Sequence, residues 1–292
     1  MTINIKGMIK KLKSYISFTK PGISRAQILT VSIGYFLAKQ AIVFNIDFIN
    51  LIIATYLFSA SACGANNLIE KDYDAKMKRT QNRELVIGKI SIAEAIAIIL
   101  VTFVVAVFFV LKLNIETLVI SLLTVVIYVF IYTPLKRISS INTYVGAIPG
   151  ALPLLGGWVA TNTPIHLAVI SLFFTLFCWQ IPHFYALSIM YFDEYKSAGF
   201  QMLPNQVGGM SATKRQMLYF SILMALSSMY PFFIGFLSEI YFLGVCILSV
   251  VFLRQVFKGM KNIENNAKKL FILSIIYLPL WFTLIIIDIV LN

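Results

Sequence analysis

Long apolar segments separated by short polar stretches fill most of the chain. Each apolar run is about twenty residues long, the length at which an α-helix crosses the hydrocarbon core of a bilayer. Only two polar stretches between spans, 66–90 and 191–216, are longer than a simple connection. We therefore predict an all-α membrane protein, one polytopic domain over residues 1–292. The nine predicted spans are 27–44, 48–65, 91–111, 117–134, 143–160, 165–190, 217–237, 240–256 and 270–291.

The composition excludes a soluble domain, because 59% of the residues are apolar and only 12% are charged, against about half and a quarter in soluble proteins. The first apolar run starts too late in the chain for a cleaved signal peptide. Segment 1–22 instead carries Ile9, Leu12 and Ile16 at helical spacing among lysines. This pattern predicts an amphipathic helix at the membrane interface, ahead of a span that begins near Pro21.

The net charge of +12 is distributed as in a membrane protein and does not indicate nucleic acid as a partner. With nine spans and a cytoplasmic N-terminus, all Lys and Arg except Lys39 and Lys112 fall on the cytoplasmic side. This asymmetry follows the positive-inside rule. It predicts a cytoplasmic N-terminus, an external C-terminus and contact with anionic lipid.

The first long polar stretch reads NNLIEKDYDAKMKRTQNR over 66–83. On a helix, Asn67, Glu70 and Asp74 lie at i, i+3 and i+7, which is one face. Mg²⁺ prefers one or two protein carboxylates together with phosphate oxygens and water. These side chains therefore predict a Mg²⁺ site for a diphosphate substrate, with Asp72 as a further metal candidate.

The second polar stretch follows a span that carries His183 directly after Pro182, a residue that interrupts helical hydrogen bonding. A packed, hydrogen-bonded core histidine is the alternative interpretation of His183. Its aromatic and acidic neighbours, which are candidates for the acceptor end of a site, are Trp179, Tyr185, Asp193 and Glu194.

Cations at the cytoplasmic end of the predicted spans are candidates for a phosphate clamp, since Arg binds phosphate through two parallel hydrogen bonds and Lys as a point charge. A positive-inside anchor is the alternative for the cluster at 132–137. The candidate diphosphate contacts are Lys20, Arg79, Arg83, Lys136, Arg137 and Lys196.

These motifs resemble the UbiA superfamily of intramembrane prenyltransferases. The superfamily pattern Asn-Asp-x-x-Asp-x-x-x-Asp is matched by Asn66, Asn67, Glu70 and Asp74. Within the superfamily, the chain is similar to the heme O synthases (protoheme IX farnesyltransferases). The blocks that carry this similarity are FTKPGI at 18–23, MKRTQNR at 77–83, YTPLKR at 132–137, NTYVGAIPGALPLLGGW at 142–158, WQIPHFYAL at 179–187 and DEYKSAGFQMLP at 193–204.

Two positions depart from the superfamily pattern. Glu70 stands where Asp is usual. His183 stands near the position at which quinone-type members begin a second acidic motif, and acids return only at Asp193 and Glu194. The resemblance therefore implies a first metal–diphosphate site more strongly than a second one.

The resemblance implies a UbiA-type fold of nine helices around a central cavity, capped on the cytoplasmic side by 66–90 and 191–216. It also implies Mg²⁺-dependent farnesyl transfer from farnesyl diphosphate to a vinyl group of heme b, with addition of water, in the cell (inner) membrane. His183 would ligate the iron, contact a propionate or position the water, and a heme A synthase or the terminal oxidase would be the protein partner. The alternatives are a UbiA-type enzyme acting on a quinone precursor or a lipid, and a membrane transporter.

Overall fold

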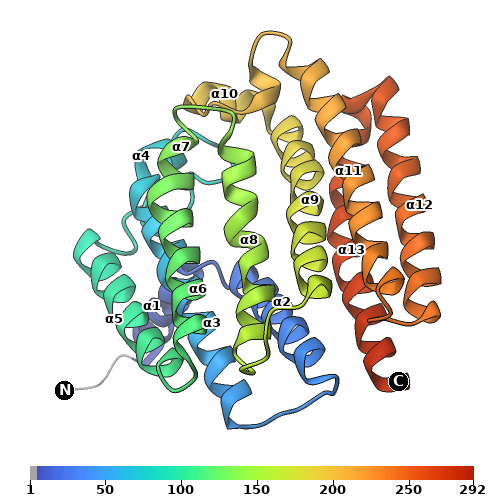
Figure 1. Cartoon of the computed structure of the whole chain (residues 1–292). Helices are drawn as coiled ribbons and strands as arrows, with labels where there is room; N and C mark the ends of the chain where they lie inside the picture. Colours follow the sequence, from blue (N-terminus) through green and yellow to red (C-terminus); the bar gives the residue numbers. More distant parts are fainter. Residues whose placement is uncertain (1–4) are drawn as a thin grey trace.

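The computed structural model describes residues 5–292, and the first four residues of the predicted interfacial segment lie outside this range. Figure 1 shows the described chain as a bundle of long helices with short elements at its upper end. No strand occurs among the described residues. The elements are α1 (Ile5–Phe18), α2 (Pro21–Lys39), α3 (Ile46–Ile69), α4 (Lys71–Asp74), α5 (Ile92–Val110), α6 (Ile115–Val126), the π-helix η1 (Ile127–Tyr132), α7 (Thr133–Leu135), α8 (Asn142–Val159), α9 (Leu167–Met190), α10 (Phe192–Ala198), the 3₁₀ turn η2 (Leu203–Asn205), α11 (Gly209–Phe233), α12 (Glu239–Lys261) and α13 (Ile263–Leu291).

Within the described residues, seven helical segments are long and apolar enough to cross a membrane. They are α3, α5, the continuous segment α6–η1–α7, α9, α11, α12 and α13. The predicted spans 27–44 and 143–160 correspond to α2 and α8, which are not among the seven, so the count of nine is not confirmed. The reason is compositional: both helices face the cavity described below with small and polar residues.

Helices α2 and α8 pack with their backbones in close approach. A Cβ added to Gly34 would lie 2.0 Å from the Leu154 carbonyl oxygen, and one added to Gly157 would lie 1.9 Å from that of Val31. Only glycine fits at both positions, as is usual where membrane helices come together. Gly34 in the first predicted span and Gly157 in the fifth therefore let α8 pack closely against α2 and fix one wall of the bundle.

Side chains at the polar connections set the helix starts. Ser91 and Glu94 form a capping box at α5, and the Asn45 and Asn114 side chains accept hydrogen bonds from the first turns of α3 and α6. Such caps satisfy N–H groups that the helix itself leaves unpaired. Helices α11 and α13 begin at 209 and 263, earlier than the predicted 217 and 270, because their polar first turns are helical as well.

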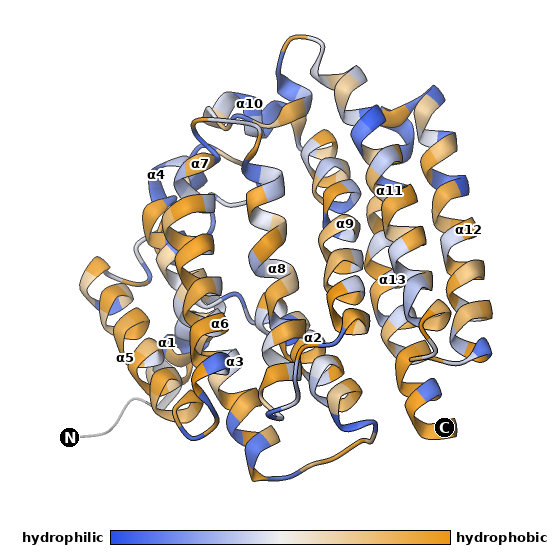
Figure 2. Ribbon diagram, in the orientation of Figure 1, coloured by the Kyte–Doolittle hydropathy of each residue, from blue (hydrophilic) through white to orange (hydrophobic). Residues whose placement is uncertain are grey.

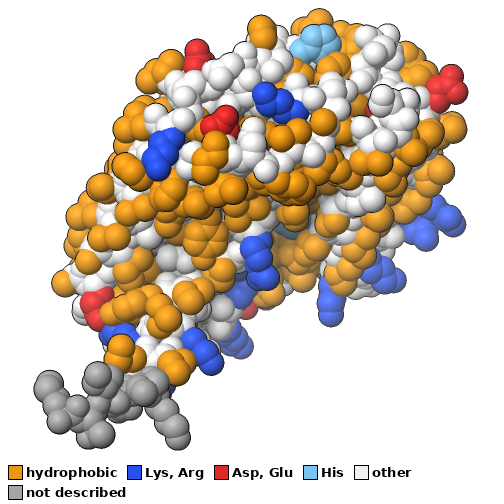
Figure 3. All heavy atoms as spheres, turned by 90° about the horizontal axis from the view of Figure 1, so that it is seen from below, with side chains coloured by type: hydrophobic (Ala, Val, Ile, Leu, Met, Phe, Trp, Pro, Cys, Tyr) orange, Lys and Arg blue, Asp and Glu red, His pale blue; other side chains and the backbone are white. Residues whose placement is uncertain are grey.

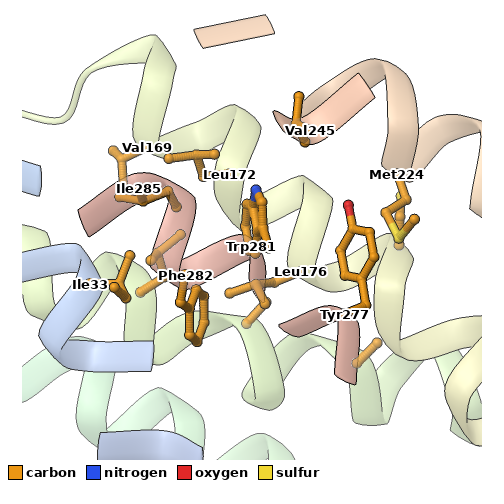
Figure 4. Close-up of a cluster of buried hydrophobic side chains, with 14 of the residues drawn as sticks. Ile33, Val169, Leu172, Leu176, Met224, Val245, Tyr277, Trp281, Phe282 and Ile285 are labelled. Carbon is orange, nitrogen blue, oxygen red and sulfur yellow. The ribbon is translucent and has the colours of Figure 1, made fainter. Parts of the chain in front are cut away.

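Large aromatic side chains fill the core between α9, α11, α12 and α13, as Figure 4 shows around Trp281 and Tyr277. The Trp281 indole N–H donates to the Tyr241 hydroxyl (2.9 Å), which donates in turn to the Ser228 carbonyl (2.8 Å). Both ring polar groups are therefore satisfied inside an apolar core, and the two bonds join α13 to α12 and α12 to α11.

The upper end of the bundle is the polar end, with hydrophilic positions concentrated around α4, α7 and α10 (Figure 2). The two predicted cap stretches are shorter than 66–90 and 191–216, because residues 66–69 complete α3 and 209–216 begin α11. The remainder forms a cap held by its own small core. This cap core contains Met77, Ala198, Phe200 and Met202, with Tyr73 and Tyr195 packed against it.

At the opposite end, Lys39 is the last residue of α2 and Lys112 lies in the short connection after α5. Seen from that side, hydrophobic side chains cover most of the surface and charged side chains are scattered (Figure 3). Helix α1 adjoins the polar end, since Lys11 pairs with Glu94 at the start of α5 (2.7 Å) and Phe18 is buried. Its residues Ile9, Leu12 and Ile16 are exposed, as expected for a helix that lies in the membrane interface.

Candidate active site

A cavity of about 450 Å³ lies beneath the cap, with walls from α2, α3, α6, η1, α8 and α9. Its cap end is charged, and its deeper walls are mainly apolar or small. The charged side chains that line it are Lys20, Glu70, Asp74, Arg79, Arg83 and Lys136. Charge is therefore confined to one end of an otherwise apolar chamber.

Each acidic side chain at this end has a cationic partner. Lys136 Nζ lies 2.9 Å from Glu70 Oε1, and Arg83 pairs with Asp74. Glu70 and Asp74 are each only 3% exposed. Buried carboxylates are stable only when paired and hydrogen-bonded, so these cations keep the acids ionised beneath the cap.

Position 66 supplies the amide of this cluster. Lys20 Nζ donates to Asn66 Oδ1 (2.6 Å), and Asn66 Nδ2 donates to Thr133 Oγ1 (3.0 Å). The Asn67 side chain turns away from the cavity and donates to the Phe18 carbonyl (2.7 Å), where it holds the end of α1. The predicted cluster was Asn67, Glu70 and Asp74, but the structure brings Asn66 together with Glu70 and Asp74. Asn66, Glu70 and Asp74 follow one another at intervals of four residues, and the chain turns at the end of α3, so these three side chains face the cavity.

The electrostatics differ between the two acids. Burial works against ionisation of Glu70, but the Lys136 ammonium, with Lys20 and Arg83, holds the pKa of this carboxyl below its usual value. Burial raises the pKa of Asp74 despite the Arg83 guanidinium. Burial and the nearby Arg83 charge lower the pKa of Lys20 to about 8. Glu70 is therefore the more strongly ionised acid of the pair.

Of the other predicted phosphate contacts, Arg79 lines the cavity and Arg137 and Lys196 do not. Arg137 donates to the Ile69 carbonyl (2.5 Å) and stacks on the Tyr73 ring, whereas Lys196 is exposed on α10. Arg137 is thus held by α3 and α4, whereas Lys196 lies over the Phe192 ring of its own helix.

The remaining acids lie outside the cavity. Asp72 and Asp193 are exposed, and neither lines it. Glu194 accepts a hydrogen bond from the Arg79 backbone N–H (3.0 Å) and so joins the two cap stretches. These positions do not add ligands to the Glu70–Asp74 cluster.

A π-helical turn places two aromatic side chains in the cavity wall: Tyr132, which belongs to the predicted cluster at 132–137, and Tyr128, which the sequence did not single out. The segment η1 contains Tyr128 and Tyr132, and both line the cavity. Lys136 Nζ lies over the Tyr132 ring, 4.6 Å from its centroid. Pi-helical turns are often found at functional sites, but neither propensity nor hydropathy distinguishes this one from regular helix.

Helix α9 presents one face to the cavity, formed by Gln180, His183, Phe184 and Leu187, with Trp179 beside it. The His183 ring stacks between Trp179 and Phe271, with centroids 5.0 and 4.9 Å away. Tyr185, predicted as an acceptor contact, is fully buried on another face and donates to the Tyr144 hydroxyl (3.2 Å). The orientation of α9 about its own axis turns Phe184, and not Tyr185, toward the cavity.

The tautomer of His183 follows from its partner. Ser274 Oγ donates to the Phe271 carbonyl (2.6 Å) and lies 2.7 Å from His183 Nδ1. With the Ser274 hydroxyl donating to the Phe271 carbonyl, the hydrogen-bond network assigns the imidazole proton to Nδ1, which donates to Ser274 Oγ. Nε2 is then the unprotonated nitrogen, and no described residue hydrogen-bonds to it.

The model of the UbiA prenyltransferase family matches residues 28–284. The chain belongs to the UbiA prenyltransferase family. This UbiA protein is an integral, multi-pass membrane enzyme, in agreement with its apolar helices.

Relatives narrow the similarity within the UbiA family. The chain is 38% identical to the protoheme IX farnesyltransferase of Rickettsia prowazekii (strain Madrid E), over 94% of this chain and 89% of the relative. It is 34% identical to the protein of that name from Solibacter usitatus (strain Ellin6076), over 95% of this chain and 99% of the relative.

Solved structures of UbiA proteins share the fold. A digeranylgeranylglyceryl phosphate synthase superimposes with a TM-score of 0.82 at 17% identity, covering 97% of this chain and all of that one. A UbiA homologue from Archaeoglobus fulgidus, bound to GPP and Mg²⁺, gives 0.66 at 15% identity, covering 93% and 99%. The observed bundle around a cavity is therefore the UbiA fold.

The donor set of this UbiA protein suits a hard cation. Among residues 5–292, no group of three or more His, Cys, Asp or Glu could hold a metal ion. Glu70, Asp74 and Asn66 nevertheless offer oxygen atoms at one end of the cavity. Two carboxylates and an amide fit Mg²⁺, which keeps places for water and phosphate oxygens.

Proposed function

We propose that this UbiA prenyltransferase joins the farnesyl group of farnesyl diphosphate to a vinyl group of heme b and adds water, giving heme O and diphosphate for terminal oxidase heme biosynthesis. The near-full-length similarity to several protoheme IX farnesyltransferases carries the assignment. The cavity supports it, because charge lies at one end and an aromatic wall with a histidine lies on α9.

The diphosphate would bind at the charged end, beneath the cap. Glu70, Asp74 and Asn66 would hold Mg²⁺, which would neutralise the charge that develops on the departing diphosphate. Lys136 and Arg83 are already within reach of the acids and would turn to the phosphate oxygens. Cations aimed at a developing negative charge stabilise the transition state most where water is excluded.

The allylic cation would form where the charged end meets the apolar chamber. Tyr128 and Tyr132 line this part of the wall, and aromatic faces attract cations without reacting with them as water does. The cap core and the contact of Glu194 with Arg79 would keep bulk water out at this stage, which favours transfer to heme over formation of farnesol.

The heme would lie against α9, where Trp179, His183 and Phe184 line the cavity. A flat aromatic acceptor matches these rings. Asp193 and Glu194, outside the cavity, would not form a second metal site. The released heme O would pass to a heme A synthase or to the terminal oxidase.

The enzyme would lie in the cell membrane with the cap on the cytoplasmic side. The support is the charge asymmetry: Lys39 and Lys112 alone among the Lys and Arg lie at the end opposite the cap. A reporter fused after Asn292 should be active only outside the cytoplasm, and activity inside would reverse this orientation.

The proposed function is tested with purified full-length protein in proteoliposomes, given Mg²⁺, farnesyl diphosphate and heme b. Mass spectrometry of the extracted pigment should show heme carrying one farnesyl group and one water. Unchanged heme, with prenylation of a quinone precursor or of a lipid glycerol supplied in parallel, would favour another UbiA activity. Transport of a substrate without any product would favour a transporter.

A further inference from the structure

Gln180 is an uncharged polar side chain on the α9 face that lines the cavity, and its two amide bonds fix its orientation. Its Nε2 donates to the Ala147 carbonyl (2.9 Å) and to the Leu176 carbonyl (3.2 Å). Both amide protons are therefore used, so the carboxamide cannot flip without losing both bonds. Oε1 is left as a pure acceptor.

The neighbouring helix leaves room for this oxygen. A Cβ added to Gly150 would lie 1.8 Å from Gln180 Oε1, so only glycine at this position of α8 permits the orientation. Gly150 and Gln180 both line the cavity. No described residue donates to Oε1. Gln180 as a whole is only 5% exposed, but this oxygen is not among the fully buried side-chain atoms that lack a partner, so it is open to the cavity that the residue lines. An acceptor without a protein donor in such a cavity is usually satisfied by water or ligand.

A second acceptor without a donor lies one turn along the same face. His183 Nε2 is unprotonated in the tautomer that Ser274 imposes, and residues three apart are neighbours on a helix surface. Gln180 Oε1 and His183 Nε2 are thus two acceptors, one from each side chain, in an apolar wall.

We propose that Gln180 Oε1 and His183 Nε2 together hold the water molecule that captures the second carbocation. This inference rests on the proposed function. A water that attacks a cation uses an oxygen lone pair, so its two O–H bonds must point to acceptors on the far side. Two acceptors without a donor bind both O–H bonds of the water and leave its lone pair directed at the cation, whereas a protein donor would turn that lone pair away from the cation.

The C1–O bond of farnesyl diphosphate breaks with both electrons going to diphosphate, and the vinyl π pair forms the new C–C bond to C1. The positive charge then lies on the vinyl carbon attached to the porphyrin ring. The held water forms the C–O bond there, and the proton that it loses passes to His183 Nε2. Without that water, the same cation loses a proton from the adjacent carbon and gives an alkene, lighter than heme O by one water.

The test is the ratio of hydrated to dehydrated farnesyl heme made by purified full-length protein in proteoliposomes. Gln180→Met removes the acceptor at similar side-chain length and should lower this ratio about tenfold, the effect of losing one hydrogen bond to the water. Gln180→Glu keeps a carbonyl oxygen and, when protonated, one donor, so it should restore the wild-type ratio. A variant that only disturbs packing would lower both products together.

Gln27 supplies the matched control. It lines the same cavity from α2, and its Oε1 has no hydrogen-bond partner and is fully buried. Gln27→Met should leave the product ratio at the wild-type value. An unchanged ratio in Gln180→Met, or an equal shift in Gln27→Met, would overturn the assignment. Wild-type protein that makes no farnesylated heme would instead refute the proposed function itself.

His183 is tested separately by the absorption spectrum of bound heme. Because Nε2 holds water and not iron in this account, His183→Ala should leave the heme bands of the complex unchanged while lowering the hydrated fraction. Bands that shift in the variant would assign His183 to the iron and overturn its place in the water site.

Discussion

The pairing of Lys136 with Glu70 leads to a quantitative prediction for Lys136→Met. The ammonium lies 2.9 Å from the Glu70 carboxylate, and the two side chains are 16% and 5% exposed. Lys136 also follows the membrane segment that ends at Leu135, so it is held at the charged end of the cavity. Methionine keeps most of the side-chain volume and removes only the charge.

Two effects of different size follow. A charge-assisted hydrogen bond to a phosphate oxygen contributes about 2 kcal/mol, so kcat/KM for farnesyl diphosphate should fall about 30-fold. Removing one partner of a buried ion pair costs about 3–5 kcal/mol of stability. The loss here should be at the lower end, because Lys20 and Arg83 also act on Glu70.

The assay is steady-state kinetics at saturating heme b in proteoliposomes, with a thermal unfolding scan of the same preparation. Lys78→Met is the control, since Lys78 is exposed on the same cap stretch and does not line the cavity. It should match the wild type. If Lys136→Met keeps wild-type kcat/KM in folded protein, Lys136 does not contact the diphosphate and the arrangement proposed at the charged end is wrong.

Further predictions concern the same end of the cavity. Asp74→Asn, nearly isosteric, should lower turnover by about 100-fold or more by removing a metal ligand, and near-normal product in isolated membranes would contradict this. Asn66→Ala should weaken diphosphate binding measured by calorimetry. Asn67→Ala should mainly lower the unfolding temperature, because it leaves the Phe18 carbonyl without its donor at a cost of about 1–3 kcal/mol. Equal losses of diphosphate binding in the two variants would refute the distinction. Lys20, with a pKa lowered to about 8, should make kcat/KM for farnesyl diphosphate fall as pH rises through about 8, because the free enzyme loses that charge. The same depressed pKa makes stability rise with pH between the folded value and the usual 10.5, since the unfolded chain binds more protons there, and Lys20→Arg should abolish both trends. Glu194→Met should raise the farnesol by-product seen by gas chromatography, because methionine has no oxygen to accept the bond from the Arg79 backbone N–H; an unchanged farnesol fraction would argue against the cap as a water barrier.

Hydropathy predicted the long helices well, because a bilayer requires long apolar helices whatever their neighbours. It was less informative for α2 and α8, where contact with the cavity and with each other selects small and polar residues. The starts of α11 and α13 were missed because their first turns are polar and lie ahead of the apolar run; the Asn262 side chain caps α13, whereas α11 begins after Gly208 without a side-chain cap.

The acidic motif was recognisable from spacing, but the side chains that enter the cavity depend on where the chain bends. Asn66 replaces Asn67 because α3 ends at Ile69 and the backbone turns before Asp74. In the same way, the rotation of α9 decides that Phe184 and not Tyr185 faces the cavity. Such choices are fixed by packing between helices, which a pattern along one chain does not contain.

Long cationic side chains were the least predictable part. Arg137 and Lys196 stand beside the right motifs, yet one stacks on Tyr73 and the other is exposed. Arg and Lys reach several neighbours from one backbone position, so their partners depend on the tertiary structure. The acceptor oxygen of Gln180 was equally hidden, since it depends on two carbonyls and on the space that Gly150 leaves.

The central claim is that this cavity joins farnesyl to heme, and the mass of the pigment tests it most directly. Full-length protein with Mg²⁺, farnesyl diphosphate and heme b should convert heme into a species heavier by one farnesyl group and one water, and Asp74→Asn should abolish this product. Heme that keeps its mass while another acceptor gains the prenyl group would contradict the account.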